Sequence, residues 1–178
     1  MPIIQYNHTR KIIMTTKETL LEQFTACYDE NGWFVALKNA VNNLTAEQAI
    51  WKTENLDNSI WGILSHLNFY NEAYLKRFKG ITVDYSDTEN SETFARTDTV
   101  SEEAWQAEIE KFDSIMTEWR SLLEAAESGK FDEAVSATNR SAWSSLIAHV
   151  NAHNAHHGGQ IVVLRKLQES WDAKQGVS

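Results

Sequence analysis

The sequence predicts an all-α protein: a four-helix bundle with a long crossover between its second and third helices. Four long segments place apolar residues at alternating steps of three and four, and no segment shows the two-residue alternation of a strand. Pro2 is the only proline and the chain has 7 glycines, so little interrupts long helices. The connection over about 80–100 exceeds the roughly 2 to 8 residues usual between bundle helices. We expect it to run the length of the bundle, which makes the second and third helices parallel and the arrangement up-down-down-up.

The first helix is expected over about 16–44, either continuous or broken at the "ENG" of residues 30–32. Thr15 or Thr16 would cap its start, and Glu18 would lie in its first turn. Its expected apolar stripe consists of Phe34, Leu37, Val41 and Leu44.

The second helix is expected over about 59–79. A short helical turn at "TAEQAIW" precedes it, with Thr45 as the capping residue and Gln48 reaching back to the cap. The apolar side of the second helix is expected to contain Ile60, Ile63, Leu67, Tyr74 and Phe78.

The third and fourth helices are expected over about 101–126 and about 141–171. The third has the most regular stripe, with steps of 4, 3, 4, 3 and 4 through Trp105, Ile109, Phe112, Met116, Trp119 and Leu123. The stripe of the fourth consists of Trp143, Leu146, Val150, Ile161, Leu164 and Trp171.

A chain of 178 residues suits one domain with its own core. We interpret residues 1–13 as an N-terminal extension, with Met14 as a candidate start, and residues 14–178 as the bundle domain. A net charge of -9 argues against nucleic acid as a partner. The single cysteine, Cys27, excludes an intrachain disulfide, and no apolar run is long enough to span a membrane. These features favour a cytoplasmic protein, and a homodimer is plausible because small bundles commonly expose apolar helix surface.

Four of the six histidines lie within the nine residues 149–157 of the expected fourth helix. Steps of three and four from Val150 lead to His153 and His157, which are four apart and can converge on one point. His66 lies at the border of the apolar side of the second helix and can face the same interior. Three buried imidazoles need partners for their nitrogens, and one bound cation would serve all three. The alternative is that they are ordinary core or surface histidines, since "HNAHH" contains no acidic residue.

Three neutral histidines that leave a coordination position open are typical of a catalytic zinc site. Zinc or nickel is the expected divalent ion, with iron and manganese as further candidates. His149 is about 12 Å along the helix axis from His157, too far to share one ion, and it could pair with His153 instead. His156 is rotated by about 100° from His157, which places it on the flank of the stripe.

Two segments resemble signatures of the DinB and YfiT-like superfamily. "HNAHHGGQIVVLRKLQESW" is similar to that superfamily's fourth-helix HNAYHxGQI-type motif, which is followed by LRKL and Trp, and "SIWGILSHLNFYNEAYLKRF" is similar to its second-helix signature. The resemblance extends over nearly the whole chain from Met14, including "LTAEQAIWK". It implies that the metal ligands are His66, His153 and His157.

The resemblance also bears on the neighbouring positions. His156 stands where the superfamily commonly has Tyr, and Gly158 stands where a larger residue is common, so at these two positions the pocket wall departs from the superfamily pattern. Gly159 and Gln160 match the motif. We interpret Gly159 as permitting close helix approach and Gln160 as a candidate residue behind a metal ligand.

Proteins of this superfamily include metal-dependent S-transferases that use low-molecular-weight thiols such as bacillithiol, and mycothiol-dependent isomerases. The resemblance therefore implies an enzyme that activates a small thiol on its metal for attack on an electrophile. Cys27 has no Lys, Arg or His adjacent in sequence to activate it, so the nucleophile would be borrowed. The alternatives are a hydrolase that uses a metal-bound water and a non-enzymatic metal-binding or dimerisation module.

Overall fold

The computed structural model describes residues 13–54, 56–94 and 100–175, and within these ranges the chain contains helices and no strands. The prediction of an all-α protein is confirmed. Four long helices form the body of the molecule: α1 (Thr16–Tyr28), α4 (Ile60–Phe78), α5 (Glu102–Ala125) and α6 (Trp143–Leu167). Short helices α2 (Leu37–Ala40) and α3 (Ala46–Ile50) and the 3-10 turns η1 (Asn90–Phe94), η2 (Ser128–Asp132) and η3 (Ala173–Gln175) complete the fold.

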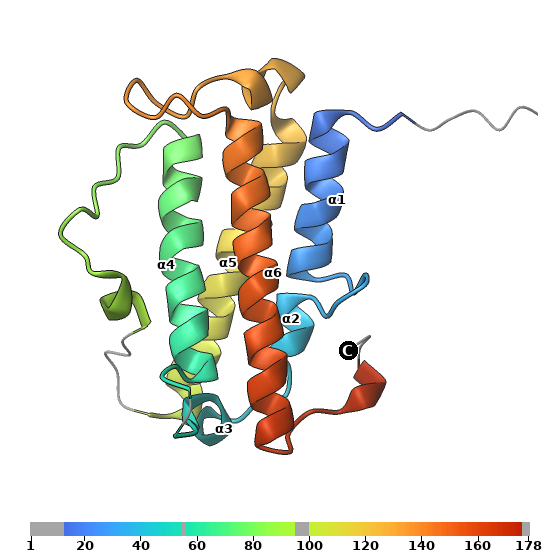
Figure 1. Ribbon diagram of the computed structural model, residues 1–178, viewed down its shortest axis with the longest axis vertical. Coiled ribbons are helices and arrows are strands. Elements are labelled where there is room, and N and C mark those ends of the chain that lie inside the picture. The colour runs from blue at the N-terminus through green and yellow to red at the C-terminus, as the bar shows by residue number, and fades with distance from the viewer. Residues whose placement is uncertain (1–12, 55, 95–99, 176–178) are drawn as a thin grey trace, which may run out of the picture.

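The four long helices lie side by side, and each packs against two others (Figure 1). α4 contacts α5 and α6, while α1 contacts α6 and α5. Figure 1 shows α1 and α6 running in one direction and α4 and α5 in the other. The described part of the connection between α4 and α5 contains η1, which packs against α4.

Hydroxyl side chains cap the starts of α1, α3, α4 and α5, close to where the sequence predicts these helices to begin. Thr15 accepts a hydrogen bond from the Glu18 amide, and Thr45 and Gln48 form the expected capping box of α3. Ser59 and Ser101 accept from the amides three residues ahead at the starts of α4 and α5. These local bonds satisfy amide groups that have no partner within the helix.

The first predicted helix is not continuous, and the alternative of a break near residues 30–32 is confirmed. α1 ends at Tyr28, and α2 begins only at Leu37. The Asn31 carboxamide oxygen accepts from the Ala36 amide at 3.0 Å and from Asn39 Nδ2 at 2.9 Å, which stabilises the turn. Because the chain turns here, Phe34 is exposed while Leu37 is buried, so the predicted single stripe is wrong.

The fourth predicted helix also ends early, at Leu167 rather than 171. Glu169 takes a left-handed conformation with φ of 61°, and the amides of Glu169 and Ser170 donate to carbonyls of the last helical turn. Trp171 therefore lies beyond the helix, where its ring covers the Arg165 guanidinium at 5.2 Å. Arg165 is buried and donates to the carbonyls of Ala40, Asn42 and Ser170, which ties the end of α6 to α2.

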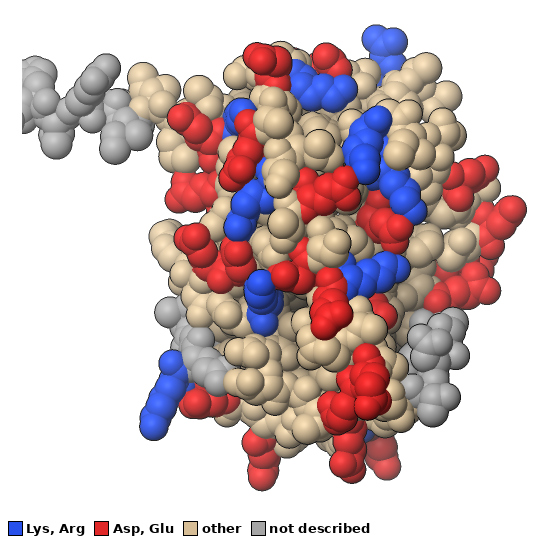
Figure 2. Space-filling view, turned by 180° about the vertical axis from the view of Figure 1, so that it is seen from behind, with Lys and Arg blue, Asp and Glu red and all other residues tan. Residues whose placement is uncertain are grey.

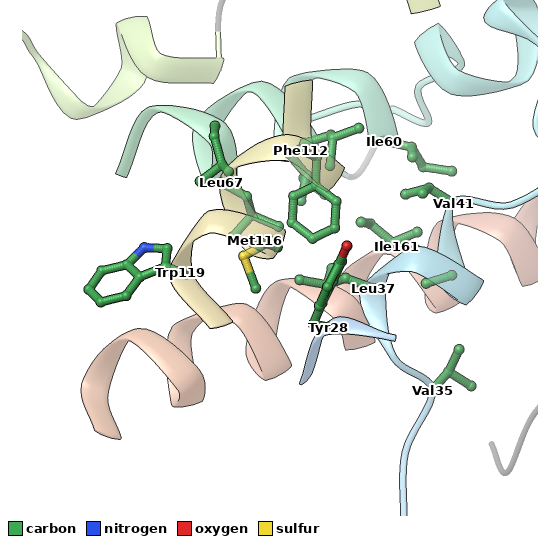
Figure 3. Close-up of a cluster of buried hydrophobic side chains, with 14 of the residues drawn as sticks. Tyr28, Val35, Leu37, Val41, Ile60, Leu67, Phe112, Met116, Trp119 and Ile161 are labelled. Carbon is green, nitrogen blue, oxygen red and sulfur yellow. The ribbon is translucent and has the colours of Figure 1, made fainter. Parts of the chain in front are cut away.

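Apolar side chains from all four long helices fill the centre of the molecule, as Figure 3 shows for one cluster. The third predicted stripe is buried at Trp105, Phe112, Met116, Trp119 and Leu123 and half-buried at Ile109. The indole N–H groups of Trp105 and Trp119 donate to the carbonyls of Leu44 and Asn71, so both tryptophans serve packing.

Charged side chains of both signs cover the face seen in Figure 2. Ion pairs join neighbouring helices, for example Lys79, the residue that follows α4, with Glu118 of α5 at 2.6 Å. None of the described helices is long and apolar enough to cross a membrane.

Candidate metal centre

His66 of α4 lies opposite His153 and His157 of α6, in the interface between these two helices. His66 Nε2 lies 3.0 Å from His153 Nε2, and His157 Nε2 lies 3.1 Å from the same atom. His153 and His157 are one helical turn apart, so their rings lie one above the other. One ligand atom from each of the three histidines lies within 4.8 Å of the others, so the group could hold a metal ion.

Hydrogen bonds on the far side of the rings assign the proton positions of two of the three imidazoles. His66 Nδ1 lies 2.6 Å from Thr93 Oγ1, and the Thr93 hydroxyl donates to the Asn90 carbonyl at 2.6 Å. Since that hydroxyl proton is already used, Thr93 must accept a proton from His66 Nδ1. His157 Nδ1 donates in the same way to Gln160 Oε1 at 2.6 Å. In both rings Nε2 therefore carries the lone pair that a metal ion requires.

Burial keeps the imidazoles neutral. The pKa of His66 is lowered to about 3. Loss of solvent is the largest cause, and electrostatic repulsion from the neighbouring His157 and His153 adds to it. The pKa of His153 is lowered to about 4, mainly by burial and to a smaller extent by electrostatic repulsion from His157 and His156. Burial likewise lowers the pKa of His157. At neutral pH all three rings are in the unprotonated form that binds metals.

The arrangement fits a bound cation better than a set of hydrogen bonds. With the Nε2 atoms of His66 and His157 unprotonated, a single proton on His153 Nε2 can serve only one of the two short contacts. The other contact then brings two lone pairs to about 3 Å of each other, which a shared cation would make favourable. Nitrogens that bind a tetrahedral ion at about 2.0 to 2.1 Å lie roughly 3.4 Å apart, close to the spacing found here.

The η1 turn holds His66 from behind. The Phe94 ring stacks on the His66 ring with centroids 3.9 Å apart and an interplanar angle of 13°. Gly62 of α4 makes this approach possible, because a Cβ atom at that position would lie 2.9 Å from the Phe94 carbonyl oxygen. Thr93 and Phe94 thus fix the ring of His66 through one hydrogen bond and one stacked contact.

The three Nε2 atoms lie in a groove of about 480 Å³ between α4 and α6. Aromatic residues of α4 and η1, namely Tyr70, Tyr74 and Phe94, line it together with Leu146 and Val150 of α6. His149 and His156 also line the groove but are exposed and do not belong to the three-histidine group. The expected position of His156 on the flank of α6 agrees with this placement.

The assignment of close packing to Gly159 is wrong, since no atom lies within 4 Å of where its Cβ would be. Its neighbour Gly158 has that role, because a Cβ there would contact Leu37 Cδ2 at 3.5 Å. Gly158 faces the interior and Gly159 faces solvent, as consecutive residues of a helix must diverge by about 100°.

Sequence reasoning missed three contributors to the site. Thr93 and Phe94 lie in a connection without apolar periodicity, so no pattern pointed to them. Asn71, which lines the groove, is paired with Asn154 in the α4–α6 interface. The only available signal for this pair was that both amides lie on helix positions otherwise filled by apolar residues.

One of three comparisons with known proteins found a match. The family model of the DinB superfamily matches residues 33–161, which include α4, α5, most of α6 and all three histidines. No curated protein and no solved structure matches the chain significantly. Because the family model covers more than half of the sequence, the chain belongs to the DinB superfamily.

Proposed function

We propose that this protein is a metal-dependent S-transferase that activates a low-molecular-weight thiol at the site formed by His66, His153 and His157. The observation that carries the proposal is the convergence of three Nε2 atoms in an accessible groove. Three imidazoles leave a coordination position for a reactant, which is typical of catalytic rather than structural sites. Zinc or nickel suits these donors best, and iron or manganese also binds imidazole.

The chain's own residues hold and orient the site. Thr93 and Gln160 keep the protons of His66 and His157 on Nδ1, which directs both Nε2 lone pairs to the same point. A divalent ion bound there would lower the pKa of a thiol and favour the nucleophilic thiolate. The proton of the thiol passes to solvent, the sulfur forms a bond to the electrophilic carbon, and the leaving group departs with its electron pair.

The thiol must come from a cosubstrate, because the protein's own thiol is inaccessible. Cys27 is buried, and its Sγ lies 3.2 Å from the Asn151 carbonyl oxygen. Burial raises the pKa of Cys27 to about 11, so it is a thiol and not a thiolate at neutral pH. A cytoplasmic setting, where small thiols are abundant and reduced, suits this reaction.

The proposed scaffold is an up-down-down-up four-helix bundle.

Elemental analysis of purified protein tests the site. We expect close to one divalent ion per chain in the wild type and loss of the ion in His66→Ala and His153→Ala. His156→Ala is the matched control, since this exposed imidazole neighbours His157 without joining the group. Circular dichroism checks that each variant keeps its helices. Equal metal content in all four proteins would refute the assignment.

A turnover assay with metal-loaded protein tests the chemistry. A panel of small thiols with electrophiles is compared with esters and amides supplied without thiol. Consumption of electrophile that requires the thiol supports the S-transferase. Consumption of esters or amides without thiol contradicts it in favour of a hydrolase, and no turnover in either panel with intact metal binding contradicts it in favour of a binding module.

A further inference from the structure

The groove beside the three histidines has one aromatic and one aliphatic wall. On α4, the rings of Tyr70 and Tyr74 lie 6.3 Å apart with an interplanar angle of 24°. On α6, Leu146 and Val150 line the other side. The Tyr70 hydroxyl donates to Asn90 Oδ1 at 3.2 Å, and the Tyr74 hydroxyl accepts from Tyr85 at 3.5 Å. The Tyr70 proton is donated and the Tyr74 oxygen accepts a proton, and the rings and aliphatic side chains make these walls mainly apolar.

None of the described residues that line this groove is Lys, Arg, Asp or Glu. The wall from α6 is part of a longer neutral stretch, because this helix carries no charged residue between Trp143 and Leu164. Elsewhere the surface carries many charges of both signs (Figure 2), and the chain as a whole has a net charge of -9. Apart from an ion held by the three histidines, a carboxylate that entered the groove would lose solvent without gaining a Lys or Arg side chain as a partner, and the net negative charge of the chain would oppose it.

We infer that the groove binds a reactant with an uncharged aromatic body, whose reacting atom then lies at the three Nε2 atoms. This inference names the substrate class of the proposed S-transferase and therefore rests on the proposed function. A volume of about 480 Å³ accommodates a molecule of one or two rings. Aromatic ligands pack on Tyr70 and Tyr74 through offset or edge contacts, which add to the benefit of apolar burial.

A pair of probes that differ only in one carboxylate tests the groove without any metal. Binding of benzyl alcohol and of 4-(hydroxymethyl)benzoate to the metal-free protein is measured by ligand-detected NMR titration. We expect the neutral probe to bind at least about tenfold more tightly, since burying a carboxylate without a partner is strongly unfavourable. Equal affinity, or tighter binding of the carboxylate, overturns the inference.

Two exposed positions on α6 provide a matched pair of variants. His149→Lys adds a cation to the groove, whereas Leu167→Lys adds the same charge to the far end of the same helix, outside the groove. We expect His149→Lys to shift the preference about threefold toward the carboxylate, and Leu167→Lys to leave it unchanged. An identical response of both variants would place the probes elsewhere and overturn the inference.

A second arm separates this inference from the proposed function. Cobalt-loaded protein is titrated with phenylmethanethiol and with 4-(mercaptomethyl)benzoate, and sulfur-to-cobalt charge-transfer absorption reports thiolate binding. Absorption that appears at lower concentrations of the neutral thiol supports both proposals, whereas earlier saturation by the carboxylated thiol overturns the inference. No absorption with either thiol, together with a retained preference for benzyl alcohol, refutes thiol activation and leaves the assignment of the groove standing.

Discussion

The side chains of Asn71 and Asn154 hydrogen-bond to each other across the interface between α4 and α6. Asn71 Nδ2 donates to Asn154 Oδ1 at 2.9 Å, and Asn154 Nδ2 donates back to Asn71 Oδ1 at 3.1 Å. The two residues are 1% and 0% exposed, so water cannot replace either bond. Because α4 carries His66 and α6 carries His153 and His157, this pair stabilises the helix register on which the site depends.

Replacing only one of these asparagines should be costly. In Asn71→Leu or Asn154→Leu the remaining amide is buried without its partner, which we expect to lower the free energy of unfolding by about 1 to 3 kcal/mol. In the double Leu variant no amide is left unpaired, so its cost should be smaller than the sum of the two single costs. Urea unfolding of the four proteins measures this coupling, and strict additivity would contradict it.

The double variant should also bind metal more weakly, because two leucines do not specify the helix register. Asn68→Leu is the control for this measurement, since Asn68 is buried on the same helix but bonds to Glu108 of α5. We expect chelator competition to show weaker metal binding in the double variant than in Asn68→Leu. The same affinity in both would mean that the register does not depend on the pair.

Two glycines of the long helices, Gly62 in the first turn of α4 and Gly159 in the second half of α6, should respond to alanine in opposite ways. At Gly159 nothing lies within 4 Å of a new Cβ, so Gly159→Ala should stabilise the protein by up to about 1 kcal/mol through helix propensity. At Gly62 the new Cβ would lie 2.9 Å from the Phe94 carbonyl oxygen, so η1 must shift and release His66. Thermal unfolding and metal content of the two variants test this, and weaker metal binding is expected only for Gly62→Ala.

Thr93 should affect metal affinity without binding the metal. Thr93→Val keeps the size of the side chain but removes the oxygen that accepts the His66 Nδ1 proton at 2.6 Å. Loss of such an outer hydrogen bond commonly lowers metal affinity by about 10- to 100-fold. Competition with a chromophoric chelator measures the change, and Thr82→Val, an exposed threonine of the same connection, is the control. Unchanged affinity in Thr93→Val would show that this bond does not orient the ring.

Cys27 should be unreactive in the folded protein. Its pKa of about 11 lies above the usual value, so the thiolate fraction falls as the pH decreases below 11 and is negligible at pH 7 to 8. We expect a disulfide reagent such as dithionitrobenzoate to label Cys27 only after the protein is unfolded in denaturant. Cys27→Ala should keep any thiol-dependent activity, and loss of that activity with the fold intact would contradict a borrowed nucleophile.

The parts of the fold that depend on neighbours in the sequence could be predicted, whereas those that depend on distant contacts could not. The starts of α4 and α5 follow from Ser59 and Ser101, because a cap bonds to amides three residues ahead. The end of α6 could not be found in this way, since Glu169 takes a positive φ that carries no signal in the residue type. The distant contacts here are those of Arg165, which donates to the carbonyls of Ala40 and Asn42 as well as to that of Ser170 in the following turn.

The same distinction applies to the candidate site. The four-residue spacing of His153 and His157 is a local property of one helix and placed both rings on one side. His66 lies 87 residues before its neighbour His153, and only its position at the border of an apolar face, supported by the superfamily resemblance, pointed to it. Thr93 bonds to it from a connection whose path no periodicity describes.

The three histidines lie in a single interface between two helices, while the apolar cluster of Figure 3 is built from other side chains of all four long helices. A replacement of a donor atom therefore leaves the packing of Phe112, Met116 and their neighbours in place. This separation makes the protein a suitable host for altered coordination chemistry: carboxylate or thiolate donors could be substituted at the three positions and compared on one unchanged framework.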